Sequence, residues 1–391
     1  MKFDTVVIGG GIIGSATAYF LSCESNAGSI CVIEPDPTYE QASTPQGAGG
    51  VRRLFSRPEN VEMSQFSLDF YANFENIVNT GDREINISFR RQGYLFVVGQ
   101  DGAKALEGNY NLQKEMGVPA DLLDVDALKA RFPSLGVDDV AMGCHSPEDA
   151  WIDPNGALQG FRRAAEVNGV TYIQDRVVKL KTHDHAVIAA QLGSGQSVQG
   201  DIFVNTAGPW CGEIAEMIGA MLPVKPMCRV QHYWLCEAEI EPLPLVKDET
   251  GMFFRPEGNG FAGGCPSFEI EPGFNFDVDR GYFANYFEET VWPLIANRLP
   301  KFNTIKLQRT WGGHYAQNSF DGNMIIGKFS TEFDNILTAC GFSGHGLMHA
   351  PAVGHALAER ILHGHDQSID LTALEITRVR ENRPYGEIGI K

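Results

Sequence analysis

Residues 3–14 read FDTVVIGGGIIG, and this stretch decides the fold of the chain. An apolar run leads into glycines at positions 9, 11 and 14, and a stretch without proline follows them. A second apolar run, SICVIEP, reaches Glu34 about twenty residues after the last glycine. This pattern of strand, glycine-rich turn, helix and strand is typical of a unit that binds a dinucleotide at the helix N-terminus.

Each of the three glycines has its own expected role. Gly9 permits the tight turn after the first strand, Gly11 leaves room for a pyrophosphate beside the backbone, and Gly14 lets the helix approach the strand. Glu34 is expected to accept hydrogen bonds from a ribose 2′-hydroxyl, and its charge would repel the 2′-phosphate of NADP. A glycine-rich turn in an ordinary α/β protein is the alternative, because 43 of the 391 residues are glycine.

Composition excludes several classes of function. A formal net charge of −18 argues against nucleic acid or an anionic membrane surface as the main partner. The eight cysteines include no CxxC pair and no cluster at zinc spacing, so we expect no metal site and reduced thiols in a cytoplasmic protein. We expect no signal peptide at Met1 and no transmembrane segment.

The rest of the chain predicts an α/β (α+β) fold of two interleaved units. A Rossmann-like unit is expected from residues 1–84, 147–218 and 311–391, and an inserted antiparallel-sheet unit for the substrate from 85–146 and 219–310. Within them, the patterns predict helices over 103–131 and 153–169 and strands over 85–98 and 170–208. Residues 333–364 predict a strand, a glycine-rich turn and a helix that starts at Leu347 or Pro351.

Four motifs resemble the flavoprotein family of D-amino-acid oxidases and dehydrogenases, glycine oxidase and sarcosine oxidase. They are GGGIIG with Glu34, VNTAGPWC (204–211), WGGHYAQNSFDGNMIIG (311–327) and GFSGHGLMHAPAVG (341–354). The tail IDLTALEITR (369–378) is similar to the closing segment of the sarcosine-oxidase-like branch. The resemblance implies an extended FAD, with the substrate on one face of its isoalloxazine ring.

Two loops are expected beside the flavin. The helix after residues 341–346 would stabilise negative charge at the N1/C2=O side of the reduced ring. The loop GAGGVRR offers the backbone of Gly47, Gly49 and Gly50, with Arg52 or Arg53 as a cation. With the resemblance, the residues expected to contact FAD are Gly9, Gly11, Ile12, Ile13, Gly14, Glu34, Pro35, Ser43, Thr44, Gly49, Gly50, Val51, Arg52, Val177, Ala207, Gly208, Trp210, Gly313, Gly344, His345, Gly346, Leu347 and Met348.

Departures from the family pattern are informative. Gly313 occupies the position of the flavin-linking cysteine, and the loop TPQGAGG lacks the linking histidine, so the FAD is expected to be non-covalent. Ala262 and Met348 stand where the oxidases carry an oxygen-activating lysine and a carboxylate-binding lysine. These absences favour a dehydrogenase. Arg255 is expected to lie too far from Ala262, seven residues along the chain, to replace the missing cation.

The implied reaction is hydride transfer from the carbon next to an amine to flavin N5, which gives an imine that hydrolyses. The candidates for binding the carboxylate of an amino acid or N-alkyl amino acid are Arg52, Arg53, Arg229 and Arg255. The candidates for orienting the amine or the flavin edge are His232, Tyr233, His314, Tyr315 and His345. The residues expected to be catalytic are Arg53, Arg229, His314, Tyr315 and His345.

Three functions remain open from the sequence. The first is a dehydrogenase that passes electrons to a quinone or an electron-transfer protein. The second is a glycine- or sarcosine-type oxidase that makes hydrogen peroxide from oxygen. The third is a weakly catalytic flavoprotein that acts as an assembly factor. The side chain and stereochemistry of the substrate are not fixed by these residues.

Overall fold

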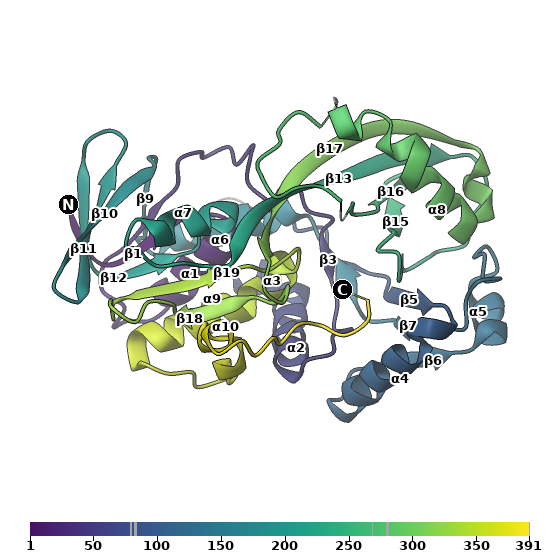
Figure 1. Ribbon diagram of the computed structural model, residues 1–391, viewed down its shortest axis with the longest axis horizontal. Helices are drawn as coiled ribbons and strands as arrows, with labels where there is room; N and C mark the ends of the chain where they lie inside the picture. The colour runs from purple at the N-terminus through teal and green to yellow at the C-terminus, as the bar shows by residue number, and fades with distance from the viewer. Residues whose placement is uncertain (79, 82–83, 268, 279–280, 391) are drawn as a thin grey trace.

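The computed structural model describes residues 1–78, 80–81, 84–267, 269–278 and 281–390, and it contains two large sheets side by side (Figure 1). The first sheet has the order β10-β11-β12-β1-β2-β9, with β19 beside β12 and β18 beside β19. Its strands are β1 (Lys2–Ile8), β2 (Ile30–Ile33), β9 (Thr171–Ile173), β10 (Val177–His183), β11 (Ala186–Leu192), β12 (Ser197–Asn205), β18 (Ile325–Lys328) and β19 (Ile336–Cys340).

The first strand explains why residues 6–8 of the opening run are all apolar. β1 pairs in parallel with β2 on one side and with β12 on the other. Val6 and Ile8 lie in one hydrophobic core, while Val7 lies in the core on the opposite face. A parallel strand that is buried on both faces needs a near-continuous apolar sequence.

Helices cover one face of this sheet. They are α1 (Ile12–Ser22), α2 (Pro58–Ala72), α6 (Pro154–Val167) and α9 (Gly346–His363). α1 packs between α6 and α9, and α2 packs against α9. A Cβ on Gly354 of α9 would lie 2.7 Å from the carbonyl carbon of Ala16, so the close contact of the two helices requires glycine. α9 ends at Gly364, whose φ of 81° is the left-handed conformation common after a helix.

The second sheet has the order β17-β13-β16-β15-β14-β5-β7-β6. Its strands are β5 (Tyr94–Val98), β6 (Asp121–Leu123), β7 (Met142–Ser146), β13 (Val224–Cys236), β14 (Leu245–Asp248), β15 (Phe253–Glu257), β16 (Gly260–Gly264) and β17 (Ile305–Asn318). All pairs are antiparallel except β14 with β5. A small third sheet joins β3 (Gly50–Val51), β8 (Ala150–Trp151) and β4 (Arg90–Arg91).

The mixed α/β fold, the helix in 153–169 and the strands in 170–208 are confirmed. The helical pattern over 103–131 is confirmed in part, because α4 (Gln100–Glu115) and α5 (Val125–Arg131) form but β6 separates them. Gly117, at a φ of 79°, follows α4, and the Asp124 side chain caps α5. In the stretch 85–98, only residues 90–91 and 94–98 form strands. α9 begins at Gly346 and includes Pro351.

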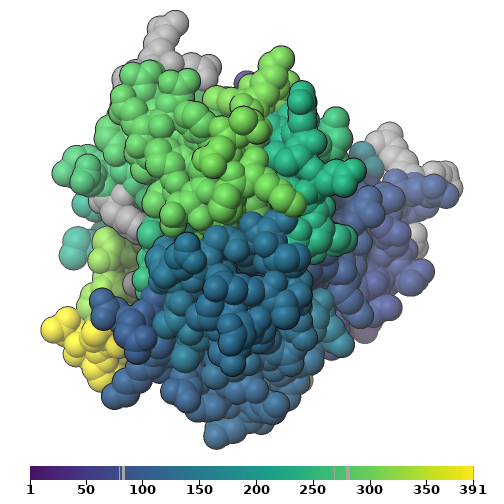
Figure 2. Space-filling view, turned by 90° about the vertical axis from the view of Figure 1, so that its right-hand side faces the viewer, coloured from purple at the N-terminus to yellow at the C-terminus, as the bar shows by residue number. Residues whose placement is uncertain are grey.

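The residue boundaries of the two expected units stay a prediction. β17 runs through the expected boundary between residues 310 and 311 and belongs entirely to the second sheet. Asp279 and Arg280 of the aromatic-rich segment lie outside the described residues. From the end formed by the second sheet, the segments around α4 and α8 (Trp292–Arg298) pack into one surface, and the C-terminal segment in yellow lies beside the first of them (Figure 2).

Candidate functional site

A cavity of about 260 Å³ opens at the carboxyl ends of β1, β2 and β12. This edge is where open α/β sheets hold their ligands. Its walls come from the end of β1, the start of α1, the segment after β2 and the turn after β12. The predicted cofactor residues that line it are Gly9, Gly11, Ile12, Ile13, Glu34, Pro35, Ser43, Val177, Ala207, Gly208 and Trp210.

The three glycines of the fingerprint meet different surroundings. Gly9 has a φ of 98°, and a Cβ there would lie 2.7 Å from the carbonyl oxygen of Thr206. A Cβ on Gly14 would lie 1.9 Å from the carbonyl oxygen of Gly9, so α1 can approach β1 only with glycine at this position. A Cβ on Gly11 would have only the Thr44 hydroxyl within 4 Å, at 3.9 Å. Gly11 therefore keeps space open at the cavity, whereas Gly9 and Gly14 are required by packing.

Glu34 presents a carboxylate to this cavity. Its Oε2 accepts a hydrogen bond from the Gly10 N–H at 2.8 Å, and its Oε1 accepts one from the Asp36 N–H at 3.0 Å. Burial raises the pKa of Glu34, although both backbone bonds oppose this shift. Each oxygen can accept a further bond from a hydroxyl donor. The first turn of α1 also offers N–H groups outside the helix's own hydrogen bonds, so these groups fit the ribose and pyrophosphate of a dinucleotide.

The segment 43–50 runs from this cavity to the second sheet. Ser43 Oγ donates to the carbonyl oxygen of His314 at 2.5 Å. The carbonyl oxygen of Gln46 accepts from Gln231 Nε2 at 2.8 Å and from Trp311 Nε1 at 3.2 Å. Side chains of two neighbouring strands, β13 and β17, thus hold a glycine-rich loop by its backbone. Gly50 is required as well, because a Cβ there would overlap the hydroxyl of Tyr94.

The two arginines after this loop have different environments. Arg53 Nε pairs with Asp149 Oδ1 at 2.8 Å, and its backbone N–H donates to Oδ2 of the same carboxylate at 3.0 Å. Arg53 therefore has a buried carboxylate partner of its own. Arg52 is 3% exposed and forms no ion pair with a carboxylate in the described part of the chain. The catalytic role of Arg53 stays a prediction, and the ion pair with Asp149 gives this side chain a structural role as well.

Aromatic rings and neutral acceptors make direct contacts with Arg52. Its guanidinium carbon lies 4.1 Å from the ring centre of Phe55 and 4.9 Å from that of Phe96. Nη1 donates to the carbonyl oxygen of Leu54, and Nη2 lies 3.3 Å from Nε2 of His345. Burial lowers the pKa of Arg52. A buried charge normally has an ionic partner, so this position suits an anionic ligand.

The other predicted catalytic residues lie in two separate parts of the structure. Arg229 donates to the carbonyl oxygen of Ser267 at 3.0 Å, and its guanidinium carbon lies 5.6 Å from the ring centre of Tyr315. Tyr315 packs against Gly344, next to His345, so these residues belong to the Arg52 side of the structure. His314, one residue from Tyr315 on β17, points to the opposite face. Its Nε2 accepts from the Asn275 N–H at 2.8 Å, and burial lowers its pKa.

The inference that Arg255 lies too far from Ala262 is wrong. β15 and β16 form a hairpin, and Arg255 is the direct cross-strand partner of Ala262. Arg255 Nε donates to the carbonyl oxygen of Ala48 at 2.9 Å, and its Nη1 pairs with the carboxylate of Glu257. Both residues line a second cavity, of about 340 Å³, beside the glycine-rich loop. A cation therefore does lie beside Ala262, already paired with a carboxylate.

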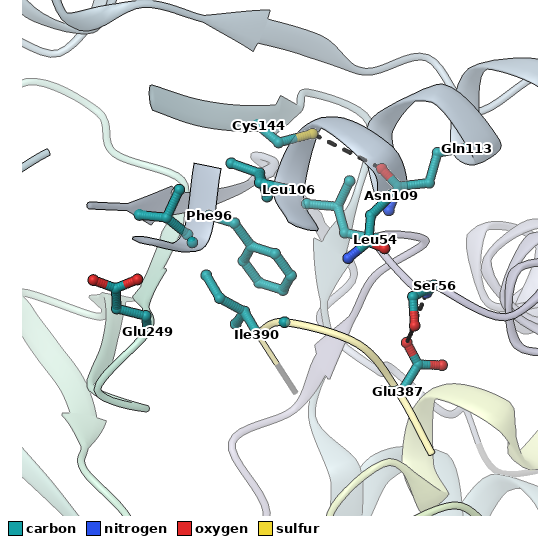
Figure 3. Close-up of a pocket in the computed structure, with 13 residues that line it drawn as sticks. Leu54, Ser56, Phe96, Leu106, Asn109, Gln113, Cys144, Glu249, Glu387 and Ile390 are labelled. Atoms are coloured by element: carbon teal, nitrogen blue, oxygen red, sulfur yellow. Dashed lines mark hydrogen bonds between the residues drawn. The ribbon is translucent and has the colours of Figure 1, made fainter. Parts of the chain in front are cut away.

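A third, smaller cavity of about 160 Å³ lies behind Phe96 (Figure 3). Leu54, Leu106 and Ile390 form apolar walls, and the carboxylates of Glu249 and Glu387 lie at its edges. Glu387 accepts from the backbone and hydroxyl of Ser56, both at 2.6 Å. Two carboxylates at the edges would repel an anionic ligand, so this cavity does not suit the carboxylate of an amino acid.

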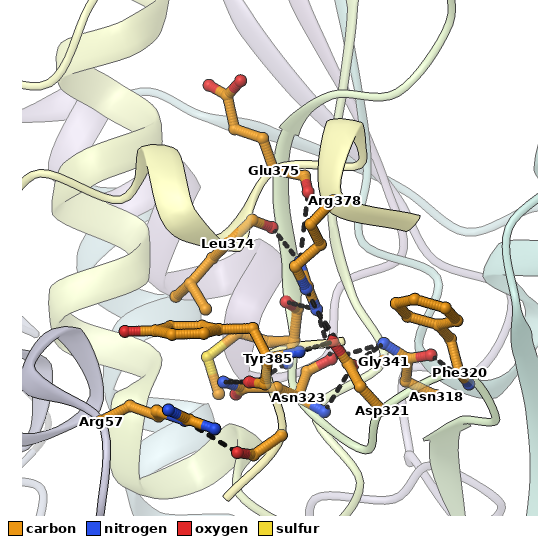
Figure 4. Close-up of polar contacts among 12 residues, drawn as sticks. Arg57, Asn318, Phe320, Asp321, Asn323, Gly341, Leu374, Glu375, Arg378 and Tyr385 are labelled. Carbon is orange, nitrogen blue, oxygen red and sulfur yellow. Dashed lines mark hydrogen bonds and ion pairs between the residues drawn. The ribbon is translucent and has the colours of Figure 1, made fainter. Parts of the chain in front are cut away.

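A buried ion pair supports the turn that precedes α9 (Figure 4). Arg378 Nε lies 2.8 Å from Asp321 Oδ2, and its Nη2 donates to the carbonyl oxygen of Met324 at 2.8 Å. Asp321 Oδ1 accepts from Asn318 Nδ2 at 2.9 Å. The Asn318 N–H in turn donates to Ser343 Oγ at 3.0 Å. The C-terminal segment thereby fixes the glycine-rich turn that leads to His345.

Comparison with known proteins identifies the family. The sequence profile described as "FAD dependent oxidoreductase" matches residues 4–360. The chain belongs to this family. FAD-dependent oxidoreductase domain-containing protein 1 of Xenopus laevis is 36% identical to it over 428 residues, which cover 100% of this chain and 85% of that protein. Mitochondrial sarcosine dehydrogenase of Mus musculus is 26% identical over 96% of this chain and 41% of that protein.

Solved structures of the same fold include enzymes of amino-acid oxidation. L-proline dehydrogenase from P. horikoshii matches with a TM-score of 0.80 and 25% identity over 98% of this chain and 99% of that chain. Glycine oxidase from Geobacillus kaustophilus matches with a TM-score of 0.81 and 19% identity, covering 96% and 99% of the two chains, which supports the fold. The predicted resemblance is confirmed, and FAD is the cofactor of this family.

Several residues that line the cavity at Glu34 were not predicted from the sequence. Tyr39, Arg176 and Met217 also line the 260 Å³ cavity, and no motif in the sequence points to them. The sequence patterns also did not anticipate that Lys247, in the apolar stretch PLPLVKD on β14, would be the strand neighbour of Phe96. A single cation inside a buried strand pattern is the signal that could have found it.

The described residues contain no helix long and apolar enough to cross a membrane. Within the same ranges, no group of three or more His, Cys, Asp or Glu side chains is arranged to hold a metal ion.

Proposed function

We propose that this flavoprotein oxidises the C–N bond of an amino acid or N-alkyl amino acid, with the substrate carboxylate bound by Arg52. The observation that carries the proposal is the environment of Arg52, a buried guanidinium without a carboxylate partner in the described chain. A guanidinium binds a carboxylate through two parallel hydrogen bonds. The comparisons support this substrate class, since sarcosine dehydrogenase and L-proline dehydrogenase are among the similar proteins.

The position that we propose for the cofactor follows from the cavity at Glu34 and from the two loops beside it. The ADP part of FAD would lie in the 260 Å³ cavity, with the ribose at Glu34 and the pyrophosphate at the start of α1. The loop 43–50 and the turn before α9 would border the flavin ring. Gly313 carries no group that could form a covalent link, which supports non-covalent FAD.

The residues of the chain then have distinct tasks. Bound FAD supplies the hydride acceptor. Arg52 would fix the carboxylate, and so the direction in which the reacting C–H bond points. His345 contacts Arg52 at 3.3 Å and would hold the guanidinium in place. Phe55 and Phe96 exclude water from the guanidinium, which strengthens its attraction for a carboxylate.

A dehydrogenase remains the preferred form of this activity. Ala262 supplies no charge, and the pairing of Arg255 with Glu257 reduces the field that Arg255 can exert on oxygen. The second candidate is an oxidase, and the position of Arg255 opposite Ala262 is the observation that favours it. The electron acceptor, the side chain of the substrate and a cytoplasmic location stay predictions.

Anaerobic mixing with a panel of D-, L- and N-alkyl amino acids tests the proposal. We expect at least one member to bleach the oxidised flavin band and to yield a keto acid or an aldehyde. Air admitted afterwards should restore the band more slowly than an added quinone does. No bleaching by any member would contradict the proposed activity, and reoxidation by air as fast as reduction would identify an oxidase.

A further inference from the structure

The cavity of about 340 Å³ beside the glycine-rich loop lies on one face of the second sheet. A row of paired residues crosses this face on four neighbouring strands, β17, β13, β16 and β15. Arg309 pairs with Tyr233, and Tyr233 pairs with Ala262. Ala262 pairs in turn with Arg255. Directly opposite residues of antiparallel strands share one face, and all four line the cavity, with the small side chain of Ala262 leaving space within the row.

An arginine stands at each end of this row. Arg255 is 7% exposed; its Nε donates to the carbonyl oxygen of Ala48 at 2.9 Å, and its Nη1 pairs with Glu257. Arg309 is exposed and forms no ion pair with a described carboxylate. Two arginines and one glutamate are the charged residues among the described residues that line the cavity. Their sum is one positive charge, in a protein whose formal net charge is −18.

Two aromatic side chains complete the walls of the cavity. Tyr233 belongs to the row itself, and its hydroxyl donates to Asn259 Oδ1 at 2.7 Å. Trp311 lines the same cavity, and the guanidinium carbon of Arg309 lies 5.7 Å from its ring centre. The bond from Trp311 Nε1 to the carbonyl oxygen of Gln46 holds this ring in place. Flat rings suit a planar conjugated ligand, and guanidinium groups suit oxygen atoms that carry negative charge.

The loop that borders this cavity starts at the dinucleotide cavity. Ser43 lines the 260 Å³ cavity, whereas Gly47 and Ala48 line this one. The four peptide steps from Ser43 to Gly47 span at most about 14 Å. A turn shortens the path, since the Gly47 N–H donates to the carbonyl oxygen of Thr44 at 3.1 Å. In the proposed function this loop borders the flavin ring, so a ligand in the 340 Å³ cavity would lie close to the reduced cofactor.

We propose that this cavity binds the electron acceptor, and that the acceptor is a quinone. A quinone is a planar conjugated ring whose oxygen atoms become negative as electrons arrive, and the net positive charge of the cavity stabilises them. The step transfers two electrons and two protons from the reduced flavin to the quinone, which leaves oxidised flavin and a hydroquinone. The inference rests on the proposed function, in which a dehydrogenase needs an acceptor other than oxygen.

Binding of a quinone to the oxidised, FAD-loaded protein tests the proposal without turnover. Duroquinone is the probe, because its fully methylated ring does not react with exposed thiols such as Cys23. A saturated cyclohexanedione is the non-planar control ligand, and dissociation constants come from calorimetry and from quenching of tryptophan fluorescence. We expect the cyclohexanedione to bind at least about tenfold more weakly than duroquinone. Duroquinone should also reoxidise the substrate-reduced protein in the absence of oxygen.

Two substitutions alter the cavity in different ways. Ala262→Leu fills the space within the row, and Arg309→Met removes an exposed charge. Each should weaken the binding of duroquinone about tenfold, which corresponds to about 1.4 kcal/mol. Lys306→Met is the matched control, because Lys306 is an exposed cation of the same strand that does not line the cavity. It should bind duroquinone like the unaltered protein, and FAD content is measured for each variant.

The outcomes separate this inference from the proposed function. Equal binding of the two ligands by the unaltered protein would overturn the inference, and so would duroquinone binding that both cavity variants keep in full. If amino acids bleach the flavin and only oxygen or an electron-transfer protein restores it, this inference fails and the proposed function stands. If no amino acid bleaches the flavin, the proposed function fails, and the inference about its acceptor fails with it.

Discussion

At the scale of single residues, the fingerprint glycines are required for two different reasons. Gly14 lies where any Cβ would meet the Gly9 carbonyl oxygen at 1.9 Å, so its role is to let helix and strand touch. Gly11 has open space on its cavity side, with only the Thr44 hydroxyl at 3.9 Å. Gly14 therefore serves the fold, and we infer that Gly11 leaves room for the bound molecule.

This difference predicts opposite outcomes for two similar substitutions. Gly11→Ala should leave the melting temperature of the FAD-free protein nearly unchanged and lower the FAD content, because the new methyl group extends into the cavity. Gly14→Ala should lower the stability of the FAD-free protein by about 1–3 kcal/mol, the usual cost of overpacking. Thermal denaturation and flavin absorbance after dialysis measure both effects. Equal loss of stability in the two variants would contradict this assignment.

At the scale of elements, the sequence correctly predicted those strands and helices that depend on interactions between residues close together in the chain. The opening strand, α1 and the helix after Asp153 follow from apolar periodicity and caps, so the sequence was sufficient. The pairing of Arg255 with Ala262 depends on a hairpin turn, and the position of Lys247 depends on a parallel pair between strands about 150 residues apart. A count of residues along the chain cannot give such contacts. β6 was missed for the same reason, since it is short and is stabilised only by pairing with β7.

The C-terminal ion pair belongs to the same scale. Arg378→Met should destabilise the protein by about 3–5 kcal/mol, because it leaves the buried Asp321 carboxylate without its partner. The exposed pair of Arg383 with Glu381 provides the control, and Arg383→Met should cost less than about 1 kcal/mol. Urea denaturation monitored by circular dichroism gives both values. Similar losses for the two variants would show that the Arg378 network does not hold the turn before α9.

At the scale of the whole molecule, the site that we propose draws on both sheets. The cavity at Glu34 belongs to the first sheet, whereas Phe96 belongs to the second. The segment 43–53 connects them, since it starts at the cavity and ends at the arginines. Neither sheet alone provides both the cavity at Glu34 and the aromatic surroundings of the Arg52 guanidinium. The proposed oxidation of a carboxylate-bearing substrate would therefore require both sheets.

The reductive half-reaction of Arg52 variants tests this account most directly. Under anaerobic conditions, the rate of flavin bleaching is measured against the concentration of the best amino acid from the panel, for the unaltered protein, Arg52→Met and Arg52→Lys. Arg90→Met removes an exposed charge from β4 and is the control. FAD content is measured for each protein.

We predict that Arg52→Met keeps its FAD and raises the apparent dissociation constant of the substrate by about 30-fold or more, the loss of a charge-assisted bond of about 2 kcal/mol. Arg52→Lys should recover part of this loss, and Arg90→Met should behave like the unaltered protein. An Arg52→Met protein that retains FAD and binds the substrate as tightly as before would contradict the central claim that Arg52 holds the carboxylate.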